Sequence, residues 1–168
     1  MKIRLAGIIR ESIVDGPGIR FVVFTQGCPH HCPGCHNPDT HPVDGGYESD
    51  TENLLAEMDK NPLLQGVTLS GGEPFLQPEP LSHLVKEANK RGLSVIAYTG
   101  FVMEELLLMA QKDVHVKALL EQLETLVDGR FEISKKNLLL RFRGSENQRI
   151  IDPAASLLQN KAVEKEDF

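Results

Sequence analysis

Residues 20–40, RFVVFTQGCPHHCPGCHNPDT, join an apolar run to a loop that holds all three cysteines of the chain. The β-branched and aromatic residues of 20–26 predict a buried strand, and Gly27 ends it. Pro29, Pro33 and Gly34 interrupt regular structure and favour turns in the segment that follows. The sequence therefore predicts a loop delivered by the carboxyl end of a strand and shaped around a ligand.

The three cysteines are Cys28, Cys32 and Cys35, spaced CxxxCxxC. Iron-sulfur clusters are normally held by four cysteine thiolates. Three thiolates on a four-iron cluster would leave one iron with an open coordination position, where a substrate or cofactor can bind. The short spacing lets a single loop wrap three corners of such a cluster.

Two other uses of these thiols remain open from the local pattern. Cys32 and Cys35 could form a thioredoxin-like redox pair, although that leaves Cys28 without a role. A structural zinc site of the Cys3His type is the stronger alternative. Its fourth ligand would be one of the nearby histidines, His30, His31, His36 or His41.

Uses that require an oxidising compartment fit the chain poorly. The segment from Cys32 to His36 matches the pattern of c-type haem attachment, which needs export. The N-terminus, MKIRLAGIIRESIVDG, has neither the apolar core nor the cleavage site of a signal peptide. An odd number of cysteines also argues against a disulfide framework. We therefore expect a cytoplasmic protein with reduced thiols.

Length and charge limit the class of protein further. The 168 residues suffice for one ordinary domain. A net charge of -6 argues against general nucleic-acid binding, and no apolar run approaches the roughly 20 residues of a membrane span. One basic group could be a solvated edge or a docking surface for an acidic partner; it comprises Lys135, Lys136, Arg141, Arg143 and Arg149.

Strand and helix patterns alternate along most of the chain. After the cysteine loop they predict a helix over 50–60, a strand over 66–72, a helix over 78–92, a strand over 93–100, a helix over 102–112 and a strand over 125–129. The periodicity of 116–123 fits either type. This order indicates a parallel sheet with right-handed crossovers and helices outside.

The length predicts a partial barrel. A complete eightfold (βα) barrel takes about 250 residues, so we expect an α/β partial barrel of about four to six units with a mostly parallel sheet. Residues 1–152 are the expected domain. Residues 153–168 are polar enough to be a loosely ordered tail.

Three unusual loops follow predicted strands and should share one face, since the chemistry of parallel α/β folds collects at the carboxyl ends of strands. They are the cysteine loop, SGGEP at 70–74 and YTG at 98–100. Gly71 and Gly72 would expose backbone groups to a ligand, and Glu73 offers an acceptor for an ammonium group. Tyr98 and Thr99 are candidates for cofactor contact.

Asp128 ends the predicted strand over 125–129. It could be a site carboxylate or the turn residue of an Asp-Gly pair, and the turn is favoured.

Together, the CxxxCxxC loop and the downstream GGEP motif resemble the radical S-adenosylmethionine superfamily. Further segments resemble the activating proteins of glycyl radical enzymes, and the short length and RFRGSENQR favour those of anaerobic ribonucleoside-triphosphate reductases. The segments span nearly the whole chain: DGPGIR at 15–20, CPHHCPGCHNPDT at 28–40, SGGEPFLQP at 70–78, YTGF at 98–101, DGRFE at 128–132 and LRFRGSENQRIID at 140–152.

The resemblance implies that the three cysteines ligate a 4Fe-4S cluster, whose fourth iron is chelated by the amino and carboxylate groups of S-adenosylmethionine. Gly71, Gly72 and Glu73 would lie against the methionyl moiety, with the Gly72 backbone and the Glu73 carboxylate facing its ammonium. Many relatives carry an aromatic residue before the third cysteine, near the adenine. Here Gly34 stands before Cys35, and His36 is expected to replace part of that contact.

The implied reaction is reductive cleavage of S-adenosylmethionine. The resulting 5'-deoxyadenosyl radical takes hydrogen from a glycine of the partner, an anaerobic ribonucleoside-triphosphate reductase, with reduced flavodoxin or a similar protein as electron donor. An open side of a partial barrel would admit the glycine loop. The alternatives are an activase of another glycyl radical enzyme, of the pyruvate formate-lyase type, or a non-catalytic zinc-binding adaptor.

Overall fold

The computed structural model describes residues 1–168 and contains seven strands and five α-helices. The strands are β1 Lys2–Ser12, β2 Arg20–Thr25, β3 Tyr47–Asp50, β4 Gly66–Gly71, β5 Ser94–Tyr98, β6 Thr125–Asp128 and β7 Arg149–Ile151. The helices are α1 Thr51–Asp59, α2 Pro78–Lys90, α3 Met103–Lys112, α4 Val114–Gln122 and α5 Pro153–Gln159. None of these helices has the length and apolarity needed to cross a membrane.

All strands belong to one open sheet in the order β3-β1-β2-β4-β5-β6-β7. The four central strands β2, β4, β5 and β6 are parallel, while β1 runs antiparallel to both its neighbours and β7 runs antiparallel to β6. Because β3 and β7 do not pair with each other, the barrel is not closed. The predicted α/β partial barrel with a mostly parallel sheet is confirmed.

Each predicted strand and helix between residues 20 and 129 is present, and the ambiguous segment 116–123 lies in α4. The cap assignment at the first helix is also confirmed, because the Asp50 side chain accepts a hydrogen bond from the Glu52 backbone N–H at 2.9 Å. The three antiparallel strands β1, β3 and β7 were not predicted.

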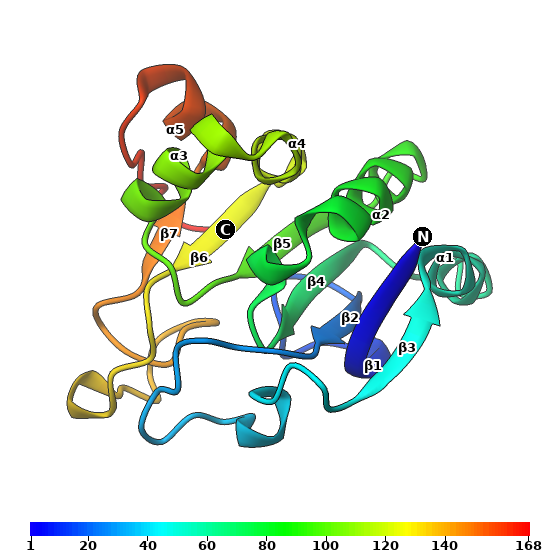
Figure 1. Cartoon of the computed structure of the whole chain (residues 1–168), viewed down its shortest axis with the longest axis horizontal. Coiled ribbons are helices and arrows are strands. Elements are labelled where there is room, and N and C mark those ends of the chain that lie inside the picture. The colour runs from blue at the N-terminus through cyan, green and yellow to red at the C-terminus, as the bar shows by residue number, and fades with distance from the viewer.

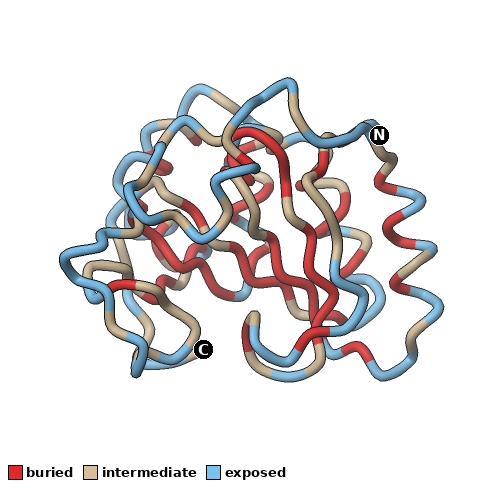
Figure 2. The backbone as a smooth tube through the Cα atoms, turned by 90° about the horizontal axis from the view of Figure 1, so that it is seen from below, coloured by how far each residue is buried: buried red, intermediate tan, exposed pale blue.

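Alternate residues of the parallel strands face opposite sides of the sheet. Phe21, Val23 and Leu69 belong to the core of 28 buried apolar residues that packs the sheet against the helices. The helices lie on one side of the sheet (Figure 1), and the buried residues follow the central strands (Figure 2). The opposite side of the sheet carries more polar side chains, including Thr68 and Ser70.

Arg20 occupies one end of this second side. Its guanidinium donates to Thr68 Oγ1 at 2.8 Å and to the carbonyls of Pro17, Val67 and Ser94 at 2.9 to 3.0 Å. Thr68 Oγ1 in turn donates to the Asp15 carbonyl at 2.7 Å. The DGPGIR segment is thus tied to the sheet by its own arginine.

The tail after Asp152 is ordered, so the expectation of a loose tail is wrong. Its first residues form α5, which Asp152 caps by accepting from the Ala155 backbone N–H at 3.0 Å. The chain then returns along β7, where Asp152 N donates to the Val163 carbonyl at 2.8 Å and Lys165 N donates to the Ile150 carbonyl at 2.7 Å.

Candidate cofactor site

The cysteine loop leaves the carboxyl end of β2 and folds back on itself. Gly27 N donates to the Thr40 carbonyl at 2.7 Å, and Cys28 N donates to the His41 carbonyl at 3.1 Å. A tight turn joins the last two cysteines, since Cys35 N donates to the Cys32 carbonyl at 3.1 Å. The two ends of the loop are therefore hydrogen-bonded to each other, and the residues between them surround a cavity.

The three cysteines are half-buried, unpaired and line one cavity of about 160 Å³. Burial raises the pKa of the Cys28 and Cys32 thiols, so both are neutral at pH 7 and would release protons on binding a metal. The Asn37 backbone N–H donates to Cys35 Sγ at 3.4 Å. Such N–H donors to sulfur are a feature of iron-sulfur sites.

Two of the nearby histidines, His30 and His31, make contacts with other side chains of the protein. His30 uses both ring nitrogens within the protein: Nε2 pairs with Glu73 Oε1 at 2.7 Å and Nδ1 accepts from Arg130 Nε at 3.3 Å. His31 packs edge-on against His41, with 5.2 Å between the ring centroids.

The SGGEP loop docks directly on the cysteine loop. Gly72 N donates to the Thr25 carbonyl at 2.8 Å, and Glu73 N donates to the Gly27 carbonyl at 2.7 Å. A Cβ at position 72 would collide with the Gly27 carbonyl, and Gly71 has a φ of +101°. Both glycines are therefore required for the close approach, and both line the cavity with the cysteines.

The Glu73 carboxylate has no exposed surface and does not line the cavity. It accepts from the backbone N–H groups of Phe75 at 3.0 Å and Gly100 at 2.7 Å, and from Thr99 Oγ1 at 2.9 Å. His30 completes this set of partners. This differs from the expectation that the carboxylate faces a ligand: burial turns it towards the protein, where it joins three loops.

Tyr98 and Thr99 both line the cavity, as predicted for residues at the end of β5. The Tyr98 hydroxyl donates to the Phe142 carbonyl at 2.7 Å, and burial raises the pKa of this phenol. Both side chains are therefore held by the protein. Tyr98 points towards the segment that joins β6 to β7, and Thr99 points towards Glu73.

Gly34 does not line the cavity, whereas Cys35 and His36 do. A Cβ at position 34 would lie 2.8 Å from Ile133 Cδ1 and 3.4 Å from an edge atom of the Phe131 ring. Phe131 lines the cavity and packs edge-on against His36 at 5.2 Å between ring centroids. The aromatic group beside the third cysteine thus comes from residue 131.

Sequence reasoning missed Phe131 and the anchoring role of His30. Phe131 follows the strand that ends at Asp128, so its position at the carboxyl edge of the sheet was an available signal. No local pattern distinguishes His30 from His31, because only the fold brings Glu73 within reach of one of them.

A second cavity, of about 620 Å³, continues from the first along the open side of the sheet. The two share His36, Asn37, Ser70, Tyr98, Phe131 and Gln148. Val14, Asp15 and Phe142 line only the larger one. The cysteines are therefore reached through a wide opening between the DGPGIR segment and the segment that joins β6 to β7.

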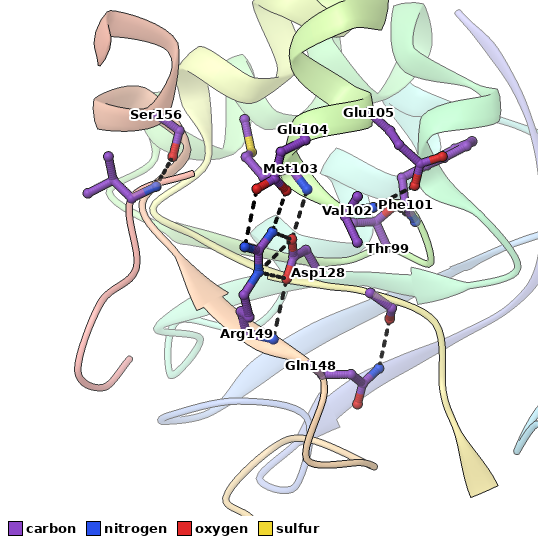
Figure 3. Close-up of polar contacts among 12 residues, drawn as sticks. Thr99, Phe101, Val102, Met103, Glu104, Glu105, Asp128, Gln148, Arg149 and Ser156 are labelled. Carbon is purple, nitrogen blue, oxygen red and sulfur yellow. Dashed lines mark hydrogen bonds and ion pairs between the residues drawn. The ribbon is translucent and has the colours of Figure 1, made fainter. Parts of the chain in front are cut away.

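Asp128 has neither of the roles considered for it. It is fully buried and accepts from the Met103 backbone N–H at 2.8 Å and from Arg149 Nη2 at 2.6 Å (Figure 3). Arg149 also reaches Glu104 at 2.6 Å. The carboxylates of Asp128 and Glu104 raise the pKa of Arg149, so this cation stabilises the junction of β6, β7 and α3.

The basic group predicted from sequence is divided by such pairs. Besides Arg149, Lys135 pairs with Glu132 at 3.3 Å and Arg141 pairs with Asp167 at 3.1 Å. Lys136 and Arg143 have no acidic partner, and Arg143 Nε is buried without a hydrogen bond. The group is therefore not one continuous surface.

The chain is similar to a known protein family and to several known proteins. Residues 14–151 match the family described as "4Fe-4S single cluster domain". The chain is 34% identical over 146 residues to the "Anaerobic ribonucleoside-triphosphate reductase-activating protein" of Escherichia coli (strain K12), covering 82% of this chain and 90% of that protein. The protein of the same name from Enterobacteria phage T4 is 33% identical over 147 residues, covering 83% of this chain and 87% of its own.

A second type of relative matches a shorter region. The "Pyruvate formate-lyase-activating enzyme" of Clostridium pasteurianum is 45% identical over 95 residues. That match covers 54% of this chain and 40% of the relative.

Proposed function

Since the chain belongs to the 4Fe-4S single cluster domain family, together with the anaerobic ribonucleoside-triphosphate reductase-activating proteins, we propose that it activates such a reductase. It would do so as a radical S-adenosylmethionine enzyme, an oxidoreductase that generates a glycyl radical. The observation that carries the proposal is the single cavity that collects three thiols and two backbone-exposing glycines.

The donor set fits a 4Fe-4S cluster with one open iron. Cys28, Cys32 and Cys35 would hold three irons, and the chain contains no fourth cysteine. When bound, the reduced cluster and S-adenosylmethionine supply a 5'-deoxyadenosyl radical that takes hydrogen from a glycine of the reductase. The protein's own contribution is to bind, orient and exclude competing reactions.

We assign a different part of cofactor binding to each group of residues around the thiols. The backbones of Gly71 and Gly72 would meet the methionyl moiety, because no side chain separates them from the cavity. Glu73 would act indirectly, by holding Thr99 and Gly100 in place through its buried carboxylate. Phe131, packed on His36, would supply the aromatic wall for the adenine.

The larger cavity supports a polypeptide substrate. It lies over the face of the sheet that carries no helices and shares lining residues with the cysteine cavity. A glycine on an extended loop could therefore approach the cofactors without a rearrangement of the barrel. Reduced flavodoxin or a similar protein would supply the electron.

The test is anaerobic. The protein is reconstituted with iron and sulfide, reduced, supplied with S-adenosylmethionine and analysed for 5'-deoxyadenosine and methionine by mass spectrometry. We expect cleavage that disappears in Cys32→Ala, and a glycyl radical detected by electron paramagnetic resonance when the reductase is added. Tightly bound zinc without sulfide, and no cleavage, would contradict the proposal.

The similarity to the pyruvate formate-lyase-activating enzyme of Clostridium pasteurianum supports a second candidate. The same reduced protein, incubated separately with each candidate partner, distinguishes the two. A radical on pyruvate formate-lyase and none on the reductase would favour this alternative.

A further inference from the structure

The segment between β6 and β7 contains a hairpin whose tip carries two exposed leucines. Residues 136–145 fold back as a hairpin: Lys136 pairs with Ser145 in an antiparallel bridge, and Asn137 N donates to the Gly144 carbonyl at 3.3 Å. At its tip Leu138 is 84% exposed and Leu139 is 93% exposed. Two adjacent leucines almost wholly in water make no packing contribution to this chain.

Both ends of the hairpin lead into the cofactor site. Just before it, Ile133 lies against Gly34 of the cysteine loop, and on its return arm Phe142 and Arg143 line the larger cavity. In Figure 1 this segment, coloured yellow to orange, lies at the lower left, next to the end of the cysteine loop. The leucine tip therefore belongs to the same short hairpin as residues that line the larger cavity.

A second exposed apolar pair lies in another segment that lines the larger cavity. Ile13 is 73% exposed and Val14 is 74% exposed, and Val14 lines the larger cavity. These residues belong to the segment between β1 and β2. Two separate segments that line this cavity thus carry exposed apolar side chains, as expected for a surface that another protein covers.

Charge specifies the kind of protein that would fit. Of the cations in 133–145, Lys135 and Arg141 are paired with Glu132 and Asp167, which lie outside this stretch, whereas Lys136 is exposed and has no acidic partner. A complementary surface would offer an apolar pocket with carboxylates around it.

We propose that the hairpin tip, Leu138 and Leu139, docks the glycine-bearing protein by inserting into an apolar pocket with an acidic rim. The inference rests on the proposed function, because that function requires a second protein to place a glycine in the cavity beside the hairpin. The leucines would fix the position of the partner, and Lys136 would steer it.

The test compares two changes of equal chemistry on surfaces of similar exposure. One variant carries Leu139→Asp, where the leucine is 93% exposed. The control carries Leu158→Asp, on α5, where Leu158 is 89% exposed. In Figure 1 α5 lies at the top of the view, away from the cysteine loop. Circular dichroism confirms that each variant is folded.

Three quantities are measured under anaerobic conditions: the dissociation constant for the reductase, radical yield on the reductase, and cleavage of S-adenosylmethionine without the reductase. Burial of leucine side chains predicts that the hairpin variant binds about 10- to 100-fold more weakly. Its partner-free cleavage should equal that of the wild type, and the Leu158 variant should match the wild type throughout. Lys136→Glu should slow association several-fold at low salt.

Unchanged binding by a folded hairpin variant would overturn the docking proposal while leaving the proposed function intact. A wild-type protein that cleaves S-adenosylmethionine but neither binds nor activates the reductase would overturn the proposed function, and the docking proposal with it. A wild-type dimer that becomes monomeric in the hairpin variant would make the tip an interface between two copies of this chain, and would also overturn the proposal.

Discussion

Asp128 carries a negative charge with no exposed surface, and its paired cation is Arg149. Arg149→Met would leave the carboxylate buried without a counter-charge, which typically costs about 3 kcal/mol or more. We expect urea denaturation to show a loss of about 3 kcal/mol in the free energy of unfolding. Arg91→Met is the control, because the Arg91–Asp59 pair is at the surface and should contribute much less. Equal losses in both variants would contradict this assignment.

His30 is the residue that ties the cysteine loop to the two loops behind it. Its side chain is 3% exposed and pairs with Glu73, and a Cβ at Gly100 would collide with its ring. His30→Ala would remove one partner of a buried carboxylate, for which about 1–3 kcal/mol is expected. We expect a lower melting temperature and several-fold faster loss of iron from the reconstituted protein to a chelator.

His31→Ala is the matched control for this change, since His31 is exposed in the same loop and packs only on His41 among the aromatic residues. It should leave both the melting temperature and the rate of iron loss near the wild-type values. If the two alanine variants lose iron at the same rate, His30 does not position the loop.

Among the elements of the fold, the contact between the loops that follow β2 and β4 depends on the absence of a side chain at Gly72. Gly72→Ala would push its Cβ into the Gly27 carbonyl, and backbone shifts of this kind cost about 1–3 kcal/mol. We expect that loss in denaturation, together with faster hydrogen exchange at the amides of Gly72 and Glu73. Gly7→Ala, with no atom within 4 Å of the added Cβ, should change neither.

The central strands were predictable because a strand whose residues are buried on both faces of the sheet has a continuous apolar sequence. The strands β2 and β5 show this pattern. The strands β3 and β7 were not predictable, since YESD and RII are too short to carry a pattern of their own. Their pairing with β1 and β6 supplies the stability that their sequences lack. Antiparallel neighbours of this kind are decided by tertiary contacts.

The candidate site also has some features that sequence patterns predict and others that depend on contacts between distant parts of the chain. The cysteines and Gly71–Gly72 lie together because the carboxyl ends of parallel strands share an edge, which spacing along the chain reveals. The direction of the Glu73 carboxylate depends on donors from Thr99, Gly100 and His30, which only folding assembles. Residue type therefore indicates where the candidate site lies, whereas the direction of the Glu73 carboxylate follows only from the fold.

In the molecule as a whole, β7 is an edge strand of the open sheet, and its outer side is covered by a segment that is not a strand of the sheet. Residues 161–168 form this segment, through the two backbone hydrogen bonds of Asp152 and Lys165. Lys165 Nζ also donates to Thr125 Oγ1 at 2.8 Å, and the ring of Phe168 packs edge-on against Phe142. The tail thus connects the sheet edge to the base of the 136–145 hairpin.

Removal of residues 161–168 should therefore weaken both regions together. The lost hydrogen bonds include two backbone bonds to β7 and the Lys165–Thr125 bond; at about 1 kcal/mol each, these alone predict a loss of about 3 kcal/mol in the free energy of unfolding. Hydrogen exchange should become faster at the amides of Asp152 and Asn137, and should stay unchanged in α1. Asp167→Asn is the control, because it removes only the exposed pair with Arg141. Faster exchange at β7 with an unaltered hairpin would show that the tail supports the sheet edge alone, and that the docking tip is held by its own hydrogen bonds.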